Sequence, residues 1–456
     1  MPTLTGGMTL AGTGMVFSPP PPPPEFSSFS FKTADDILRP SDVAKTYLYP
    51  NSKRGGIRTF KISETKFVTI GMYKTTNSGT DPSDVTYYCT LSTIANDGTI
   101  TQINAVELWD IQNYGTWGQE SDCGYCEIYQ FDTDKYAIAE YYGNCNGGGS
   151  QNYNSYLRPF TLDTTTGAVT KANNWTTLPK SDMSWSSTPQ YADRIGGGCV
   201  IDSTKMWRMR TTGGTDKVFT ALFRYRTYHW IHTIDWANFN ISHSVNTVYN
   251  DESGQPLMSN DRLTKFLMPG GDKIMTMSMT GGGNNIGCLV IDVSGATPVP
   301  GPRRDYRFQA YGGTMMNGIN INGDGVGMTS TMGTVFCENT AGNIAAISFT
   351  ITGTNDNTNI NTSLNFGSEA SNFTQAFRLD DSRAAVVMKN GNGSGQTWTV
   401  ANLSSDGTMT SIGPPTSNTN VDSYNGMNAV KLDSGKILSV TRAAISTDGS
   451  DGYLVE

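Results

Sequence analysis

Histidines are the first residues in this sequence that could support chemistry, and there are three of them. His229 and His232 are three positions apart in an aromatic run that also holds Trp230 and Trp236. Side chains alternate across a strand with a period of two, so this spacing places the two imidazoles on opposite faces. With His243 as the only other histidine, we expect no histidine metal site, and we expect these rings to pack among the tryptophans.

The cysteines include one cluster with the spacing of a metal site. Cys123 and Cys126 are separated by two residues and Cys145 follows, but a structural zinc site needs a fourth ligand and the neighbourhood offers none. The total of seven is odd, and most of the others lie in apolar runs. The sequence predicts free thiols in a chain made in a reducing cytosol, with zinc or an opportunistic disulfide at the cluster as the alternatives.

Paired carboxylates would be needed for glycosidase chemistry. Six acidic residues lie in segments that could share one face of the molecule, although the sequence alone cannot pair them: Asp110, Glu120, Asp122, Glu140, Asp182 and Asp193. The Asp- and Gly-containing segments 96–99, 322–325 and 446–452 lack the ligand spacing and terminal Glu of a calcium loop, and they resemble hairpin turns.

Glycine runs are numerous, but none forms part of a phosphate-binding loop or a dinucleotide fingerprint, and there is no nucleophile elbow. The runs at 147–149, 196–198 and 281–283 are interpreted as loop hinges between strands. The sequence therefore predicts no cofactor, no metal and no enzymatic activity. A glycosidase-type activity is the alternative.

Aromatic residues are the remaining candidates, because the chain has 21 Tyr, 18 Phe and 8 Trp. Two long segments rich in Asn and Gly, 109–125 and 141–156, hold Trp109, Tyr114, Trp117, Tyr141, Tyr142 and Tyr153. Flat rings beside amide and hydroxyl groups suit sugars or protein partners. The same rings could instead cover the faces of sheets, so these six residues are candidate receptor or glycan contacts.

Composition excludes several classes of protein. Of 456 residues only 16 % are charged, and the net charge is −8, which argues against a coiled coil and against a partner that is nucleic acid or an anionic membrane. No apolar stretch approaches the length that spans a bilayer, so we expect no membrane insertion. The first 17 residues contain no Lys or Arg, and we expect no secretory signal peptide.

A repeated pattern organises the chain from Phe26 onward. An apolar run ends in a short polar turn and a second apolar run follows at once, at intervals of roughly 50–70 residues. The predicted turn positions are Lys66, Lys135, Lys205, Lys273, Thr334, Arg383 and Lys436. A third run and a second turn, often with Asp-Gly or Thr-Gly, follow each pair. Each repeat therefore has four short antiparallel strands, and we expect the turn residues to be exposed.

The last repeat supplies only three strands, within 430–432, 436–442 and 452–456. The fourth strand can come from 26–50, where FSSFSF alternates cleanly and TYLYP is the other candidate, while Ala34–Leu38 is the best helical candidate. The fold predicted is all-β, a seven-bladed β-propeller of four-stranded antiparallel blades whose ring is closed by an N-terminal strand. A pair of β-sandwiches is the alternative.

The N-terminal end divides into an extended docking arm (1–18), a polyproline linker (19–25) and the propeller domain (26–456). The arm is too short to fold alone, so it is either disordered or ordered by a partner. Its apolar residues are the candidate contacts with that partner: Leu4, Met8, Leu10, Met15, Val16 and Phe17. Six prolines form a stiff spacer, or alternatively a ligand for an aromatic groove.

The start MPTLTGGMTLAGTGMVFSPPPPPP resembles the Thr/Gly-rich N-terminal segments, ending in proline runs, of structural proteins of tailed bacteriophages, especially marine and cyanobacterial ones. The remainder resembles virion-associated β-propellers. This resemblance implies a structural virion protein, made in the host cytoplasm, that serves as a tail fibre, appendage or capsid decoration. Its implied partners are other virion proteins of capsid or tail and a host-surface glycan or protein, with a homo-oligomer left open. A carbohydrate-binding or glycan-degrading propeller and an intracellular propeller scaffold are the alternatives.

Overall fold

The computed structural model of the 456-residue chain describes those segments that form the strands and their short turns. These segments are residues 31–37, 47–48, 57–74, 85–110, 124–142, 154–172, 176–177, 194–215, 223–249, 263–280, 285–302, 304–307, 324–338, 343–352, 357–369, 371–389, 395–418, 428–432, 436–442 and 450–455.

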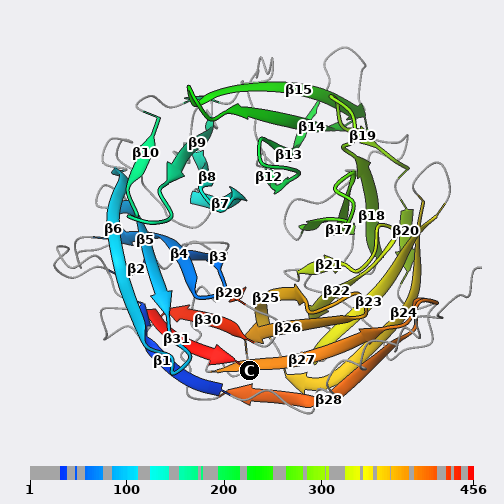
Figure 1. The fold of residues 1–456 in the computed structure, drawn as a ribbon. Helices are drawn as coiled ribbons and strands as arrows, with labels where there is room; N and C mark the ends of the chain where they lie inside the picture. Colours follow the sequence, from blue (N-terminus) through cyan, green and yellow to red (C-terminus); the bar gives the residue numbers. More distant parts are fainter. Residues whose placement is uncertain are drawn as a thin grey trace, which may run out of the picture.

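Seven antiparallel sheets form a ring (Figure 1). Strands such as β3, β7, β12 and β21 lie towards the centre, and β1, β6, β15 and β28 lie on the outside. Within each blade the strands are named below from the innermost to the outermost. The chain is a seven-bladed β-propeller. Blade 1 has β3 (Ile57–Ser63), β4 (Lys66–Lys74), β5 (Val85–Ile94) and β6 (Ile100–Asp110), with β2 (Tyr47–Leu48) also on β4. Blade 2 has β7 (Gly124–Asp132), β8 (Lys135–Tyr142), β9 (Asn154–Leu162) and, both on β9, β10 (Val169–Lys171) and β11 (Thr176–Thr177). Blade 3 has β12 (Arg194–Val200), β13 (Lys205–Thr215), β14 (Phe223–Asp235) and β15 (Asn240–Tyr249).

The remaining blades follow the same order around the ring. Blade 4 has β16 (Leu263–Leu267), β17 (Lys273–Thr280), β18 (Asn285–Asp292) and, both on β18, β19 (Val299–Pro300) and β20 (Arg304–Arg307). Blade 5 has β21 (Gly325–Gly327), β22 (Met332–Glu338), β23 (Asn343–Thr352) and β24 (Asn357–Glu369). Blade 6 has β25 (Ser371–Arg378), β26 (Arg383–Lys389), β27 (Gln396–Leu403) and β28 (Met409–Asn418). Blade 7 has β29 (Asn428–Lys431), β30 (Ile437–Arg442), β31 (Ser450–Val455) and β1 (Phe31–Ile37).

Strand direction gives the ring two distinct faces. In each antiparallel blade, the turns from first to second and from third to fourth strand lie at one end, which we call the short-turn face. The connections from second to third strand and from blade to blade lie at the opposite end, the long-loop face. The strands β6, β8 and β11 end towards the long-loop face, and the sequence segments 111–123, 143–153 and 178–193 follow them in the chain.

Ring closure by an N-terminal strand is confirmed. β1 pairs antiparallel with β31, so the outer strand of the last blade comes from the start of the propeller domain (Figure 1). The strand begins at the last residue of FSSFSF and continues through Ala34–Ile37, most of the segment that was the best helical candidate. Pairing with β31 satisfies the backbone of these residues as a strand, so this candidate helix does not form. The other candidate, TYLYP, contributes Tyr47–Leu48 to blade 1 instead.

Six of the seven predicted turn positions occupy the same place in each blade. In each of these blades the residue closes the hairpin between the first and second strands. In some blades its carbonyl accepts a hydrogen bond across the turn, as Lys436 O accepts Leu432 N–H at 3.0 Å. In blades 1 and 2 it forms the first residue pair of the ladder, as Lys66 does with Ser63. Blade 5 differs from the prediction, because Met328 N–H bonds to Met332 O at 2.8 Å. Met332, not Thr334, is therefore the equivalent residue. The register of this degenerate repeat was misplaced because it carries no basic residue in its turn.

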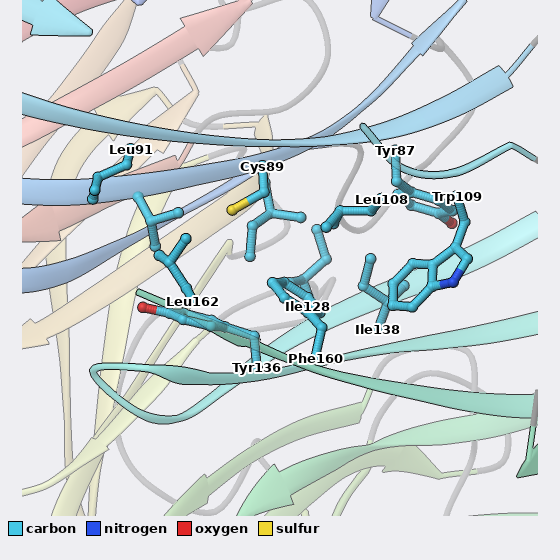
Figure 2. Close-up of a cluster of buried hydrophobic side chains, with 12 residues drawn as sticks. Tyr87, Cys89, Leu91, Leu108, Trp109, Ile128, Tyr136, Ile138, Phe160 and Leu162 are labelled. Atoms are coloured by element: carbon cyan, nitrogen blue, oxygen red, sulfur yellow. The ribbon is translucent and has the colours of Figure 1, made fainter. Parts of the chain in front are cut away.

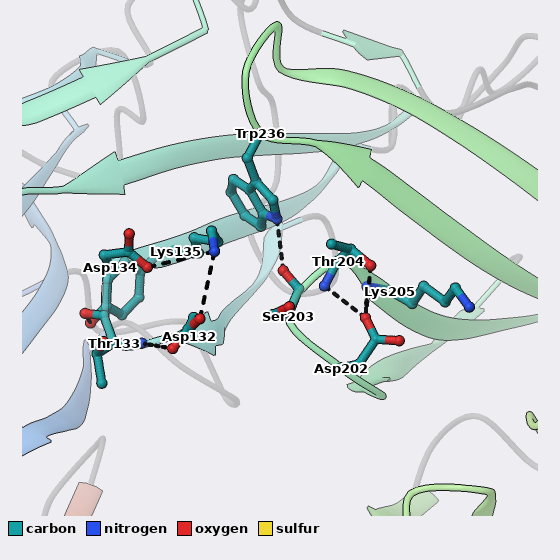
Figure 3. Close-up of polar contacts among 10 residues, drawn as sticks. Asp132, Thr133, Asp134, Lys135, Asp202, Ser203, Thr204, Lys205 and Trp236 are labelled. Carbon is teal, nitrogen blue, oxygen red and sulfur yellow. Dashed lines mark hydrogen bonds and ion pairs between the residues drawn. The ribbon is translucent and has the colours of Figure 1, made fainter.

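The turn residues are half-buried rather than exposed, and Met332 is buried. Polar contacts explain this: Lys66 Nζ donates to Thr164 O at 2.9 Å in the next blade. Figure 3 shows the turns of blades 2 and 3, where Lys135 lies 3.5 Å from the Asp132 carboxylate and Asp202 accepts the backbone N–H of Lys205 at 2.8 Å. The turns thus belong to the packed structure of the ring.

The hydrophobic core consists of clusters between neighbouring blades. Between blades 1 and 2, side chains of β4, β5 and β6 pack against those of β7, β8 and β9 (Figure 2). Similar clusters join blades 2 and 3, 3 and 4, 4 and 5, 5 and 6, and 6 and 7. Each blade therefore buries its faces against its neighbours, which is why the repeats require one another.

Candidate functional site

Trp109, a predicted receptor contact, belongs to the core. It lies in β6 and is only 9 % exposed, with its ring 5.8 Å from that of Phe160 in an edge-on contact. The guanidinium of Arg158 lies 5.5 Å from the centre of the same indole. Contact with blade 2 therefore occupies this side chain, and the prediction that it contacts a receptor is wrong (Figure 2).

The other predicted contacts fall at or beyond the strand ends. Tyr141 and Tyr142 are the last residues of β8, paired in register with Ser155 and Asn154, and this end of β8 is on the long-loop face. Tyr114, Trp117 and Tyr153 and the six arm residues lie outside the described residues. Among the candidate carboxylates, Asp110 ends β6 and Glu140 lies in β8, and the remaining four are outside the described residues.

The inner strands place a set of polar residues at equivalent positions around the central axis. In six blades a polar residue in the first strand, or directly before it, lies opposite the fourth residue after the one that closes the first hairpin. These residues are Arg58, Glu127, Thr264, Asp324, Gln375 and Asn428. Of these, Arg58, Glu127, Asp324 and Gln375 are half-buried.

Three of these residues make the same contact with the next blade. Glu127 Oε2 accepts Gly198 N–H at 3.2 Å, Asp324 Oδ2 accepts Ala376 N–H at 3.1 Å, and Gln375 Oε1 accepts Ala429 N–H at 2.6 Å. Gln375 also donates from Nε2 to Ala429 O at 2.7 Å. A first strand has an open edge towards the axis, and these bridging side chains satisfy its backbone groups. We call Glu127, Asp324 and Gln375 the bridging residues.

Glu127 also joins blades that are not neighbours. Its Oε1 lies 2.7 Å from Lys265 Nζ, and both side chains are about one-seventh exposed, at 13 % and 14 %. This ion pair joins blade 2 to blade 4, and blade 3 lies between them in the ring. In blade 3 the glycine run Gly196–Gly198 lies within β12. The interpretation of this glycine run as a loop hinge is therefore wrong. A Cβ on Gly198 would lie 2.8 Å from Trp207 O, so close packing of β12 on β13 requires glycine there.

Burial raises the pKa of Asp324, although the Ala376 and Gly325 N–H groups and the charges of Arg58 and Lys265 act in the opposite direction. Burial also raises the pKa of the nearby Cys199 thiol to about 12, so it is not a thiolate near neutral pH. The two carboxylates are already engaged by backbone donors and by Lys265. The arrangement therefore holds blades together.

His229 and His232, both in β14, pack against tryptophans as predicted. His229 stacks on Trp207 at 5.9 Å and His232 stacks on Trp230 at 6.4 Å, on opposite faces of β14. Trp207 takes the place expected for Trp236, whose Nε1 donates to Ser203 O at 2.7 Å. Burial lowers the pKa of His229 to about 3, so the ring is neutral at physiological pH.

Within the described residues, no three His, Cys, Asp or Glu side chains gather in an arrangement that could hold a metal ion. Cys89, Cys199 and Cys288 are free thiols there. None of the described residues belongs to a helix long and apolar enough to cross a membrane.

Comparison with known proteins identifies no family. No family model matches the chain, and no curated protein matches it. Solved structures share the general strand arrangement at very low identity. The NanB sialidase from Streptococcus pneumoniae is 10 % identical with a TM-score of 0.43, over 91 % of this chain and 70 % of that one. A candidate 6-phosphogluconolactonase from Bacteroides fragilis is 12 % identical with a TM-score of 0.42, over 76 % of this chain and 81 % of that one.

A third structure, prolyl oligopeptidase B from Galerina marginata, is 8 % identical with a TM-score of 0.40, over 86 % of this chain and 48 % of that one. At this level of similarity no catalytic residue, substrate or partner can be transferred to this chain.

Proposed function

We propose that this chain is a structural and binding subunit of a phage particle, anchored by its N-terminal arm and presenting the long-loop face to a partner on the host surface. The observation behind the proposal is the register of β1. Phe31 pairs with Val455, at the end of β31 that lies on the short-turn face. The arm and proline linker are therefore attached at the face opposite the long loops.

The distribution of sequence between the two faces supports this division of roles. On the short-turn face, lysines and aspartates of the turns contact their own or neighbouring blades, as Lys66 and Lys436 do. The strands β6 and β8 end at the long-loop face, and the sequence segments that follow them contain Tyr114, Trp117 and Tyr153 among Asn, Gly and Ser. Connections on a rigid scaffold are common places for recognition, and rings beside amides suit a neutral glycan.

A binding role agrees with the chemistry of the described residues better than a catalytic one. The bridging residues Glu127 and Asp324 hold backbone N–H groups of the next blade, and Cys199 is protonated near neutral pH. The resemblance of the first 24 residues to phage structural proteins adds the particle as the site of anchoring. The subunit would then act through its attachment and its partner, without a cofactor.

Deletion of residues 1–24 tests the anchoring. The truncated chain should fold with an unchanged melting temperature, because the closing strand begins at Phe31, but it should be absent from purified particles. A control chain keeps residues 1–18 and replaces the six prolines with a Gly/Ser segment of equal length, and it should still incorporate. Incorporation of the truncated chain at the normal level would contradict the proposal.

A cell-binding assay tests the recognition face. The double substitution Tyr114→Ala and Trp117→Ala should reduce binding of the protein to host cells, with no change in melting temperature. Glu64→Ala, an exposed residue in a turn of the short-turn face, is the matched control and should leave binding unchanged. If the double variant, the Glu64→Ala control and the unsubstituted protein bind equally, recognition does not depend on Tyr114 and Trp117.

A further inference from the structure

The ladder between β1 and β31, which we call the closure ladder, has a defined direction relative to the two faces. Its register pairs are Phe31 with Val455, Lys32 with Leu454, Thr33 with Tyr453, Ala34 with Gly452 and, after an irregularity, Ile37 with Ser450. The start of β1 and the end of β31 thus lie side by side on the short-turn face. Ile37 and Ser450 lie at the other end, towards the long-loop face.

We propose that the closure ladder is a mechanical clamp that resists tension between an anchored arm and a partner held at the long-loop face. Such tension runs parallel to the strands and pulls β1 along its own axis. All pairs of the ladder then share the force and must break together. This use of the ladder rests on the proposed function, because it takes the arm as the anchor.

The opposite geometry would make the ladder weak. If the two chain termini are pulled apart, force acts first on the Phe31–Val455 pair and opens the ladder one pair at a time. If the arm were attached at the end of β1 that lies towards the long-loop face, tension between the particle and the partner would open the ladder one pair at a time. The observed direction of β1 is therefore the one that favours anchoring through the arm.

The structure connects the clamp to the whole ring. β31 pairs on its other side with β30 over its full length, from Ile437–Val455 to Arg442–Ser450. Blade 7 is joined to blade 1 by the bond from Lys436 Nζ to Asn96 Oδ1 at 2.6 Å. Since β31 has partners on both sides and β1 is the outer strand, β1 is the strand that must separate first.

Single-molecule force spectroscopy on the full chain tests the clamp. One attachment is at Met1, and the other is either at Glu456 or at a peptide tag inserted between Thr340 and Ala341, in the connection from β22 to β23 on the long-loop face. Insertions are generally tolerated best between secondary-structure elements. At the same loading rate, the first rupture between Met1 and the tag should need at least about twice the force of that between Met1 and Glu456, because four consecutive pairs share the force.

In both geometries the first rupture should release the chain before Tyr47, the start of β2, which identifies β1 as the strand that separates. Equal rupture forces in the two geometries, or a first rupture that releases another blade, would overturn the clamp. The result is separate from the incorporation assay. A chain can be strong in this direction and still fail to anchor, which would refute the proposed function alone.

Discussion

Lys436 Nζ donates to Asn96 Oδ1 at 2.6 Å, across a separation of 340 residues, and so joins the seventh blade to the first. Comparable contacts cross other seams of the ring: Lys66 Nζ reaches Thr164 O at 2.9 Å, and Ser348 Oγ reaches Gly407 O at 2.6 Å. The turns of the short-turn face therefore help to hold neighbouring blades in place. Some of their polar side chains therefore make contacts between blades as well as facing solvent.

Removal of residues 450–456 should destroy ring closure. The deletion takes away β31, and it leaves β1 without a partner and β30 with an open edge. We expect aggregation or a large fall in melting temperature, measured by circular dichroism and light scattering. The chain lacking residues 1–24 is the control and should melt as the full chain does. A deletion variant that melts normally as a monomer would contradict closure by β1.

The substitution Gln375→Ala tests the bridging residues. It removes two hydrogen bonds to Ala429 and leaves backbone groups of a buried inner strand without their partner. The free energy of unfolding should fall by about 1–3 kcal/mol in chemical denaturation. Thr101→Ala, an exposed substitution in β6, should change it by less than about 0.5 kcal/mol. Equal values for the two variants would show that the bridge is energetically neutral.

Glycine 198 offers a test of packing in blade 3. In Gly198→Ala the new Cβ would lie 2.8 Å from Trp207 O and from Met206 Cε, so the backbone of β12 must move away from β13. Overpacking of this kind costs about 1–3 kcal/mol. Gly295→Ala is the matched control, because its nearest atom outside the adjoining residues is Thr297 O at 3.7 Å. Equal stability of the two variants would show that β12 can shift freely.

Much of the fold follows from local patterns in the sequence. Repeated apolar runs around polar turns predict the blades, because hairpins with a buried face are specified by alternation and turn residues. The missing fourth strand of the last repeat predicts closure from the N-terminal side. The pattern was insufficient at Ala34, where FKTADDI lacks clean alternation and long-range pairing with β31 determines the conformation. It was also insufficient at Met332, where the turn lacks its basic residue.

The candidate sites were harder to predict, because whether a residue is buried depends on the neighbouring blade. Trp109 occurs at the edge of a loop-like segment, yet Phe160 and Arg158 from blade 2 enclose it. The bridging residues were missed, although a signal existed. Glu127 and Gln375 precede the basic residues that close their hairpins by the same number of positions, and an alignment of the repeats would have placed them together.

The final prediction concerns acid. His229 is buried against Trp207 and its pKa is lowered to about 3 by that burial, from an ordinary value of 6.5. Below pH 6.5 the unfolded chain therefore binds a proton that the folded chain does not bind until about pH 3. The contribution of this group to stability is complete above pH 6.5 and is lost as pH falls towards 3.

His232 acts in the same direction, because its pKa is also lowered, chiefly by burial. The turn carboxylates of Asp202 and Asp380 also lose stability in acid, but only below their ordinary pKa of 3.8, because their pKa values are lowered further. Burial raises the pKa of Asp324, so this group changes stability in the opposite direction, but it does so equally in the substituted and unsubstituted chains. The difference in slope between the two chains from pH 7 to pH 5 therefore isolates His229. In His229→Phe one of the two contributions disappears, and the fall in unfolding free energy should be shallower by about 1.4 kcal/mol per pH unit well below pH 6.5.

The slope is the informative quantity, because the larger phenyl ring can change stability at every pH by the same amount. Unfolding free energies from urea titrations at several pH values give that slope, with Thr101→Ala as a control that should reproduce the slope of the unsubstituted chain. If His229→Phe gives that same slope, His229 is protonated in the folded chain. Its stack on Trp207 must then open to water under these conditions.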